Sequence, residues 1–173
     1  MRTYRDMRPF FIFGWICAAT LLIVVTGCRT SHLPAPSDVL PEGNSTVERI
    51  RISAITEFIP NPTAADRVQI KTLVELLNAS GAPLEAPCVL RFELYEFRPL
   101  SSDPRGRRLL IWPNQSLSEP DTNKEQWKDF LRGYEFVLPV EFALERGKKY
   151  VLEATCLINQ RRYSDLFKIQ YQP

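Results

Sequence analysis

The stretch that decides the fold is Cys88-Val89-Leu90-Arg91-Phe92-Glu93-Leu94. Apolar side chains and Cys88 occupy its even-numbered positions, whereas Arg91 and Glu93 stand between them. Successive side chains of a β-strand point to opposite faces, so this alternation predicts a strand with one face on a core and the other turned outward.

The same period of two recurs on both sides of this stretch. It is present at residues 49–53, 68–72, 134–138 and 150–156, and residues 162–171 supply a last strand. Turn-forming pairs such as Ser80-Gly81 and Asn159-Gln160 separate these segments. About seven strands with no long helix predict an all-β fold, a single antiparallel β-sandwich. For residues 68–77 a helix is the alternative, because Leu73, Leu76 and Leu77 have helical spacing.

The longest excursion between strands covers residues 98–133. Its first part predicts a hairpin-like tip rich in arginine, followed by a short strand at residues 109–112. Its last part, residues 123–133, predicts one short helix with Asn123 as N-cap, Trp127, Phe130 and Leu131 as apolar face, and Gly133 just after its end.

Loops carry binding residues more often than strands do, so function is expected in this excursion. An arginine-bearing tip beside exposed aromatic side chains suits an acidic partner, a sugar or a peptide. The candidate partner-binding residues are Arg105, Arg107, Arg108, Trp112 and Trp127.

One further motif resembles a known fold family. Leu144-Glu145-Arg146-Gly147-Lys148-Lys149-Tyr150 is similar to the E–F corner of immunoglobulin-like and fibronectin type III domains. In those domains the tyrosine hydrogen-bonds back to the preceding loop, and Tyr150 holds that place. The resemblance implies an immunoglobulin-like sandwich over residues 48–173. It departs from antibody domains, since Cys156 follows the tyrosine by six residues rather than two.

Cys88 and Cys156 both fall on the apolar face of their predicted strands. In an oxidising compartment they form a possible disulfide. The alternative is a pair of buried thiols that act as small hydrophobic side chains. Sequence spacing leaves both interpretations open. No metal site is expected, because a third and a fourth ligand are missing.

The N-terminal residues predict export. Arg2, Arg5 and Arg8 precede an apolar run at residues 10–25, which ends in Val25-Thr26-Gly27-Cys28. This ending resembles the lipobox of bacterial lipoproteins. The resemblance implies a signal peptide at residues 1–27, lipidation of Cys28, and a membrane attachment through acyl chains.

Residues 28–47 then form the lipidated cysteine and a Pro-rich tether. Arg29, in place of the Asp that often marks inner-membrane retention, favours the outer membrane over the inner one. An uncleaved anchor is the alternative, but the apolar run is shorter than the roughly 20 residues that cross a bilayer.

Composition excludes several classes of function. Removal of residues 1–27 leaves 19 basic and 19 acidic side chains, so nucleic acid is not an expected partner. The single histidine, His32, lies in the tether, so the usual general base of hydrolases is missing from the domain. No phosphate-binding loop or cofactor motif is present. We therefore expect a non-enzymatic binding or structural module of the cell envelope, without a cofactor, whose partner is an envelope protein or a glycan.

Two alternatives to this expectation stay open. Lipobox, Pro-rich tether and small sandwich together resemble the outer-membrane lipoprotein of type VI secretion systems, and residues 87–95 are similar to its early Val-rich strand. That resemblance implies an assembly component of an envelope complex. The other alternative is a carbohydrate-binding module, which needs a flat strip of exposed aromatic side chains, with Trp112 and Trp127 as the candidates.

Overall fold

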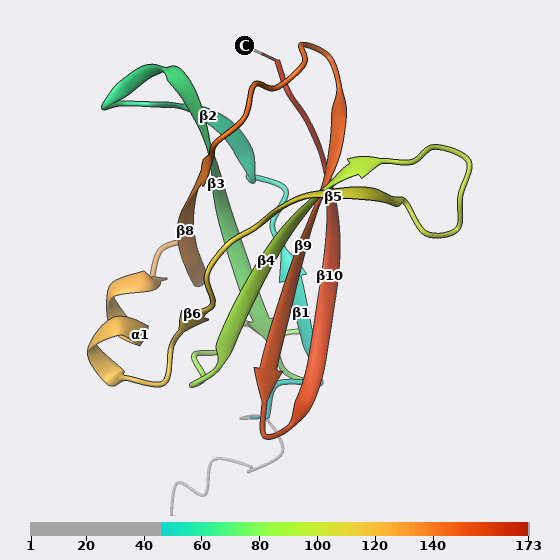
Figure 1. Ribbon diagram of the computed structural model, residues 1–173. Helices are drawn as coiled ribbons and strands as arrows, with labels where there is room; N and C mark the ends of the chain where they lie inside the picture. Colours follow the sequence, from blue (N-terminus) through green and yellow to red (C-terminus); the bar gives the residue numbers. More distant parts are fainter. Residues whose placement is uncertain (1–45, 173) are drawn as a thin grey trace, which may run out of the picture. The chain divides into compact units, whose positions relative to one another are not determined.

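The computed structural model describes residues 46–172, with the side chains of residues 65 and 66 left out. This part of the chain consists of ten β-strands and one short helix. The strands form two antiparallel sheets of five strands each (Figure 1). The prediction of an all-β antiparallel sandwich with one short helix is confirmed. The proposed signal peptide, Cys28 and nearly all of the tether lie outside the described residues.

The first sheet has the strand order β1-β3-β8-β7, and β2 also pairs with β3. Its strands are β1 (Arg49–Ile52), β2 (Glu57–Asn61), β3 (Ala64–Leu77), β7 (Trp127–Lys128) and β8 (Gly133–Val140). The helix alternative for residues 68–77 is wrong, because β3 is extended throughout. Every second side chain from Ile70 to Leu76 is buried toward the core, and both edges of β3 have partner strands.

The second sheet has the order β10-β9-β4-β5, and β6 pairs with β4. Its strands are β4 (Val89–Phe97), β5 (Arg105–Ile111), β6 (Gln115–Ser116), β9 (Lys149–Ile158) and β10 (Arg161–Gln170). The predicted turn at Asn159-Gln160 joins β9 to β10 and is confirmed. Both of its residues have positive φ, 46° and 66°, which is the backbone of a two-residue hairpin turn.

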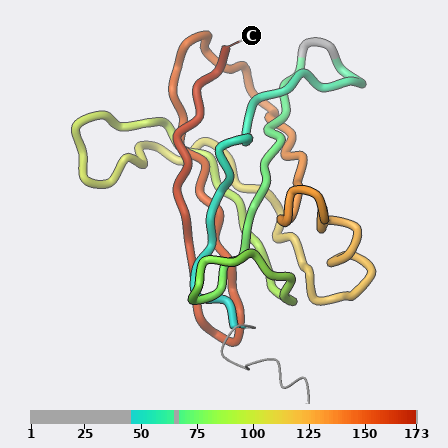
Figure 2. Tube along the Cα trace, turned by 180° about the vertical axis from the view of Figure 1, so that it is seen from behind, coloured from blue at the N-terminus to red at the C-terminus, as the bar shows by residue number. Residues whose placement is uncertain are grey.

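Apolar side chains from both sheets meet in one core. The apolar side chains at even-numbered positions of β4 and β9 and at odd-numbered positions of β10 belong to it. Along one edge β1 lies beside β10 (Figure 2), where the backbone N–H of Ile52 donates to the Asp165 carboxylate at 2.8 Å. The opposite side chains of the second sheet therefore face away from the core, and several of them are charged.

The helix is displaced from its predicted position. Helix α1 covers Pro120–Gln126, with Glu119 as N-cap and Pro120 in its first turn, where proline needs no hydrogen-bond partner for its nitrogen. Trp127 already has an extended backbone. It begins β7 and pairs with Tyr134 of β8. Gly133 does not end a helix but begins β8, where an added Cβ would lie 3.1 Å from the side chain of Leu73.

The β4–β5 hairpin extends beyond the other strands in both views (Figures 1 and 2). Within residues 46–172, no helix has the length and apolar character to cross a membrane.

Candidate binding surface

The outward face of the second sheet carries two buried glutamates. Cross-strand pairing places Glu93 of β4 directly opposite Glu153 of β9. Their side chains are only 8% and 3% exposed, although neither points into the core. We call the surface around them the arginine face, which comprises Arg91, Glu93, Tyr95, Arg105, Arg108, Glu153, Thr155 and Arg162.

Glu153 is held by Arg105 of β5. The Arg105 Nη1 atom donates to both carboxylate oxygens of Glu153 at 3.0 Å. Asp103 fixes the same guanidinium from the other side, accepting from its Nε at 3.0 Å. These hydrogen bonds, to Asp103 first and then to Glu153, raise the pKa of Arg105 above its ordinary value. Arg105 therefore stays charged and compensates the buried Glu153 carboxylate.

Glu93 has three donors. Arg91 Nη2 donates to Oε1 at 2.9 Å, Arg108 Nη1 donates to the same oxygen at 3.0 Å, and the Tyr95 hydroxyl donates to Oε2 at 2.7 Å. Burial favours the protonated carboxyl, but the hydrogen bonds from Tyr95 and Arg91 and the charges of Arg91 and Arg108 outweigh it and lower the pKa of Glu93. Burial, followed by the hydrogen bond to Glu93, raises the pKa of Tyr95 to about 12.

The carboxylates are hidden while the guanidinium groups are exposed. The side chains of Arg91, Arg108 and Arg162 are 46%, 54% and 64% exposed. What this surface presents to solvent is therefore positive, because its two buried carboxylates offset only half of the charge of its four arginines. A desolvated carboxylate is costly unless it is paired, so each glutamate fixes the guanidinium groups that cover it.

The three arginines predicted for the hairpin tip lie instead along its stem, because β5 begins at Arg105. Arg105 and Arg108 pair with the buried glutamates, whereas Arg107 extends into solvent. It is 75% exposed and contacts Glu96 at 3.2 Å. The tip itself presents Leu100, which is fully exposed and has a φ of 55°.

Trp112 is not available for binding. It is buried in the core, with 6% of its surface exposed, and its indole Nε1 donates to the Pro139 carbonyl at 2.8 Å. This bond ties the end of β5 to β8 of the other sheet. The expectation that Trp112 lines a strip of exposed aromatic residues is therefore wrong, and the carbohydrate-binding alternative loses one of its two candidates.

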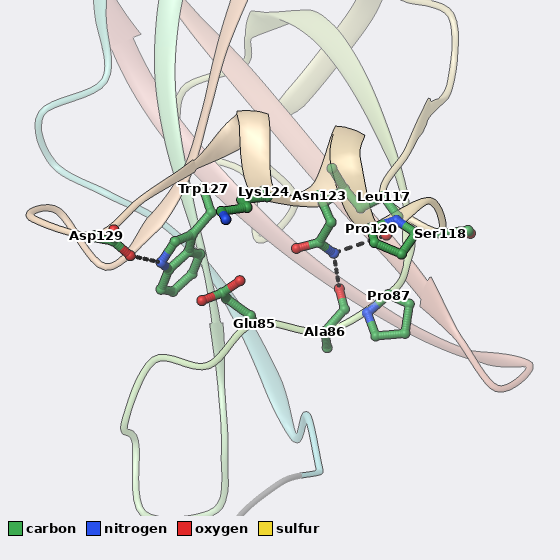
Figure 3. A pocket seen from close by; sticks show the side chains of 10 residues that line it. All are labelled: Glu85, Ala86, Pro87, Leu117, Ser118, Pro120, Asn123, Lys124, Trp127 and Asp129. Atoms are coloured by element: carbon green, nitrogen blue, oxygen red, sulfur yellow. Dashed lines mark hydrogen bonds between the residues drawn. The ribbon is translucent and has the colours of Figure 1, made fainter.

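Trp127 is half-buried in a separate place, beside a groove next to α1 (Figure 3). Its ring packs edge-on against Tyr134 at 5.1 Å between centroids, and its Nε1 donates to Asp129. The groove has a volume of about 570 Å³, and its apolar lining includes Ala86, Pro87, Leu117 and Trp127. Phe130, which the sequence placed with Trp127 on the apolar face of the expected helix, is instead 96% exposed.

Asn123 joins the groove's two walls. Its side-chain amide donates to the carbonyls of Ala86 at 3.2 Å and Leu117 at 2.9 Å, and its Oδ1 accepts from the Tyr134 hydroxyl. Asn123, predicted as an N-cap, therefore lies inside the helix. Its side chain connects α1 to the segment before β4 by a hydrogen bond to Ala86. The structure thus brings Arg105 and Arg108 together but leaves Trp112 and Trp127 apart from them.

Cys88 and Cys156 lie in the core, as their position in the alternation predicted. The pairing of β4 with β9 places Cys156 opposite Leu90. Cys88, two residues before Leu90 and just ahead of β4, is therefore the diagonal neighbour of Cys156. Both thiols are free in the structure. A hydrogen bond with the Cys88 thiol, and then burial, raise the pKa of the Cys156 thiol well above its ordinary value. The choice between a disulfide and two thiols stays a prediction for experiment.

Sequence reasoning missed Arg91, Glu93, Glu153 and Arg162 as members of one site. The signal was present, since Arg91 and Glu93 occupy outward positions of the most regular strand, and Glu153 does so in another. Only the strand order shows that these two strands are neighbours.

Comparison with known proteins assigns no family. No protein-family model matches the chain, and no curated protein and no solved structure shows significant similarity to it.

Proposed function

We propose that this protein is exported, lipidated at Cys28, and acts as a non-enzymatic, membrane-tethered binding module of the cell envelope that engages its partner through the arginine face. The main support for this proposal is the pair of buried glutamates that lie under exposed arginines on the outward face of the second sheet. A sheet face that served only as a solvated surface has no need of buried charges. Arginine is also enriched where proteins bind one another.

The export part of the proposal rests on residues 25–28, which end the apolar run, and on the Pro-rich residues that follow. The folded part begins next to this tether, since Val47 is already buried and the backbone N–H of Glu48 donates to Leu77. A tether of this kind leaves a domain anchored to the membrane but free to reach a partner. Arg29 favours the outer membrane.

The non-enzymatic part rests on the chemistry of the buried carboxylates. Arginines and a tyrosine hold Glu93, and two of those donors carry positive charge. This keeps the carboxylate ionised and occupied, whereas a general acid or base needs a pKa near the working pH and free access to substrate.

Anchoring is tested by labelling cells with a fatty-acid analogue and fractionating their membranes. Cys28→Ala should lose the label and leave the membrane fraction, because no other cysteine stands at the end of the apolar run. Cys17→Ala is the matched control and should be labelled like the wild type, since Cys17 belongs to the signal peptide. Persistent labelling of the Cys28 variant would contradict the proposal.

Binding through the arginine face is tested with a photoreactive amino acid placed in the full chain in its own envelope. Ile111 lies opposite Glu93 on this face and is 44% exposed, and Val137 on the first sheet is 50% exposed and serves as control. The proposal expects a discrete adduct from position 111 and none from position 137. Equal adducts from both positions, or none from position 111, would reject the arginine face as the binding surface.

A further inference from the structure

A hollow of about 200 Å³ opens beside the buried glutamates on the arginine face. Its walls come from three strands and the segment after β5: Val89, Arg91, Asn114, Thr155, Leu157 and Arg162. Two guanidinium groups therefore border one small hollow, one from β4 and one from β10. Neither arginine belongs to the excursion in which sequence reasoning expected the binding residues.

Among the four arginines of the arginine face, Arg162 is the one least committed to contacts within the protein. Its nearest carboxylate oxygen, on Glu153, lies 3.9 Å away, and its only close acceptor is the Thr155 hydroxyl at 3.4 Å. Glu153 already receives two bonds of 3.0 Å from Arg105, so it has little to offer a second guanidinium. Most of the hydrogen-bonding capacity of Arg162 thus faces solvent.

Arg91 is fixed at one end and open at the other. Its Nη2 is bonded to Glu93, while the side chain as a whole is 46% exposed. A guanidinium that is already oriented loses less freedom when it binds a ligand. Arg91 therefore offers an already oriented donor at one edge of the hollow, and Arg162 offers a largely uncommitted one at the other.

The size and lining of the hollow select a carboxylate. An arginine fork matches a planar carboxylate in two parallel hydrogen bonds. Val89 and Leu157 supply apolar walls for the methylene groups of an Asp or Glu side chain, and Leu157 is 50% exposed. The buried charges of Glu93 and Glu153 nearby disfavour an anion of higher charge, such as a phosphate group.

We propose that this hollow receives an aspartate or glutamate side chain from an acidic segment of the partner protein, held by Arg162 and Arg91. This inference rests on the proposed function, because it names the chemistry of the partner at the same face. Exposed Ile111 and Leu166, outward residues of β5 and β10, give such a segment apolar contacts beyond the hollow.

The test measures binding of a fluorescently labelled oligoglutamate peptide to the full lipidated chain in detergent micelles, by anisotropy at low ionic strength. An oligoglutamine peptide of equal length is the ligand control. We expect the glutamate peptide to bind more tightly than the glutamine peptide. Arg162→Gln should weaken its binding on the order of tenfold, the effect of losing one charge-assisted hydrogen-bond pair. Arg146→Gln, an exposed arginine in the loop before β9, should leave binding unchanged.

Every other outcome overturns the inference. Equal binding of the two peptides, or equal loss in the Arg162 and Arg146 variants, would show that the hollow does not select carboxylates. Displacement by inorganic phosphate as efficiently as by acetate at matched ionic strength would show an anion site without that selectivity. Leu157→Ser changes an apolar wall of the hollow at an exposed position. The inference expects this variant to bind the glutamate peptide more weakly and to stay folded. A partner captured at position 111 together with an unaltered Arg162→Gln variant would uphold the proposed function and reject this inference.

Discussion

The backbone N–H of Glu145 donates a hydrogen bond of 3.1 Å to the hydroxyl of Tyr150. Tyr150 is the second residue of β9 and is 2% exposed, and Glu145 lies in the loop that leads from the first sheet to the second. The bond therefore ties the loop that connects the two sheets to the beginning of β9. Phe58 packs edge-on against the same ring, with 5.9 Å between centroids.

Tyr150→Phe should lower the free energy of unfolding by roughly 1–2 kcal/mol, because the Glu145 N–H loses its acceptor while the ring packing is retained. Urea unfolding of the purified chain measures the change. Tyr163→Phe is the control, since no hydrogen bond of the Tyr163 hydroxyl is found among the described residues, and it should change stability much less. Tyr95→Phe is unsuitable as a control, because the Tyr95 hydroxyl donates to Glu93.

The strands were predictable because one face of each is buried. Alternation forces a period of two wherever a strand lies on a core, and the segments around Ile50, Phe92 and Leu152 are all strands in the structure. β3 was ambiguous in sequence because its leucines satisfy two periods. Its extended state is decided by the partner strands on both of its edges, which local sequence does not reveal.

The binding surface was predictable only in part. Arg105 and Arg108 were identified in sequence, but their partners Glu153 and Glu93 come from strands whose adjacency depends on the fold. The burial of Trp112 was missed for the same reason, since its indole is placed by Pro139 of the opposite sheet. The helix begins earlier than predicted, because Pro120 is a strong signal for a first helical turn and outweighs Asn123 as the signal for its start.

Arg105→Ala should destabilise the domain by roughly 2 kcal/mol. The substitution leaves Arg162, at 3.9 Å, as the nearest remaining cation to the buried Glu153 carboxylate. The cost is reduced from that of a fully buried pair because Arg105 is 35% exposed. Arg107→Ala, at the 75% exposed neighbour, should have little effect on a thermal melt. Three solvated arginines would all be dispensable for stability, so the contrast between these two variants tests the pairing of Arg105 with Glu153. Equal melting temperatures for the two variants would argue that Glu153 finds another partner.

The thiols should be unreactive in the folded protein. A raised pKa leaves little thiolate on Cys156, and both sulfurs are buried. Alkylation of the fully reduced chain at mildly alkaline pH should be on the order of 100-fold slower in buffer than in urea. Parallel titration in urea without prior reduction decides the open question of the disulfide. Two reactive thiols beyond any at Cys28 mean that Cys88 and Cys156 are not bonded, whereas none means that they are.

The Tyr95–Glu93 hydrogen bond should make stability depend on alkaline pH. Because the pKa of Tyr95 rises from 10.0 to about 12 on folding, the folded state binds its proton more tightly than the unfolded state does. The stability this contributes is fully present below pH 10 and is lost as the pH rises toward 12. The wild type should therefore exceed Tyr95→Phe in stability at neutral pH, and this difference should shrink steadily through the alkaline range. Urea unfolding of the wild type and of Tyr95→Phe at a series of pH values measures it. A Tyr95→Phe difference that does not change with pH would mean that the phenol ionises alike in both states, and that its bond to Glu93 does not persist in solution.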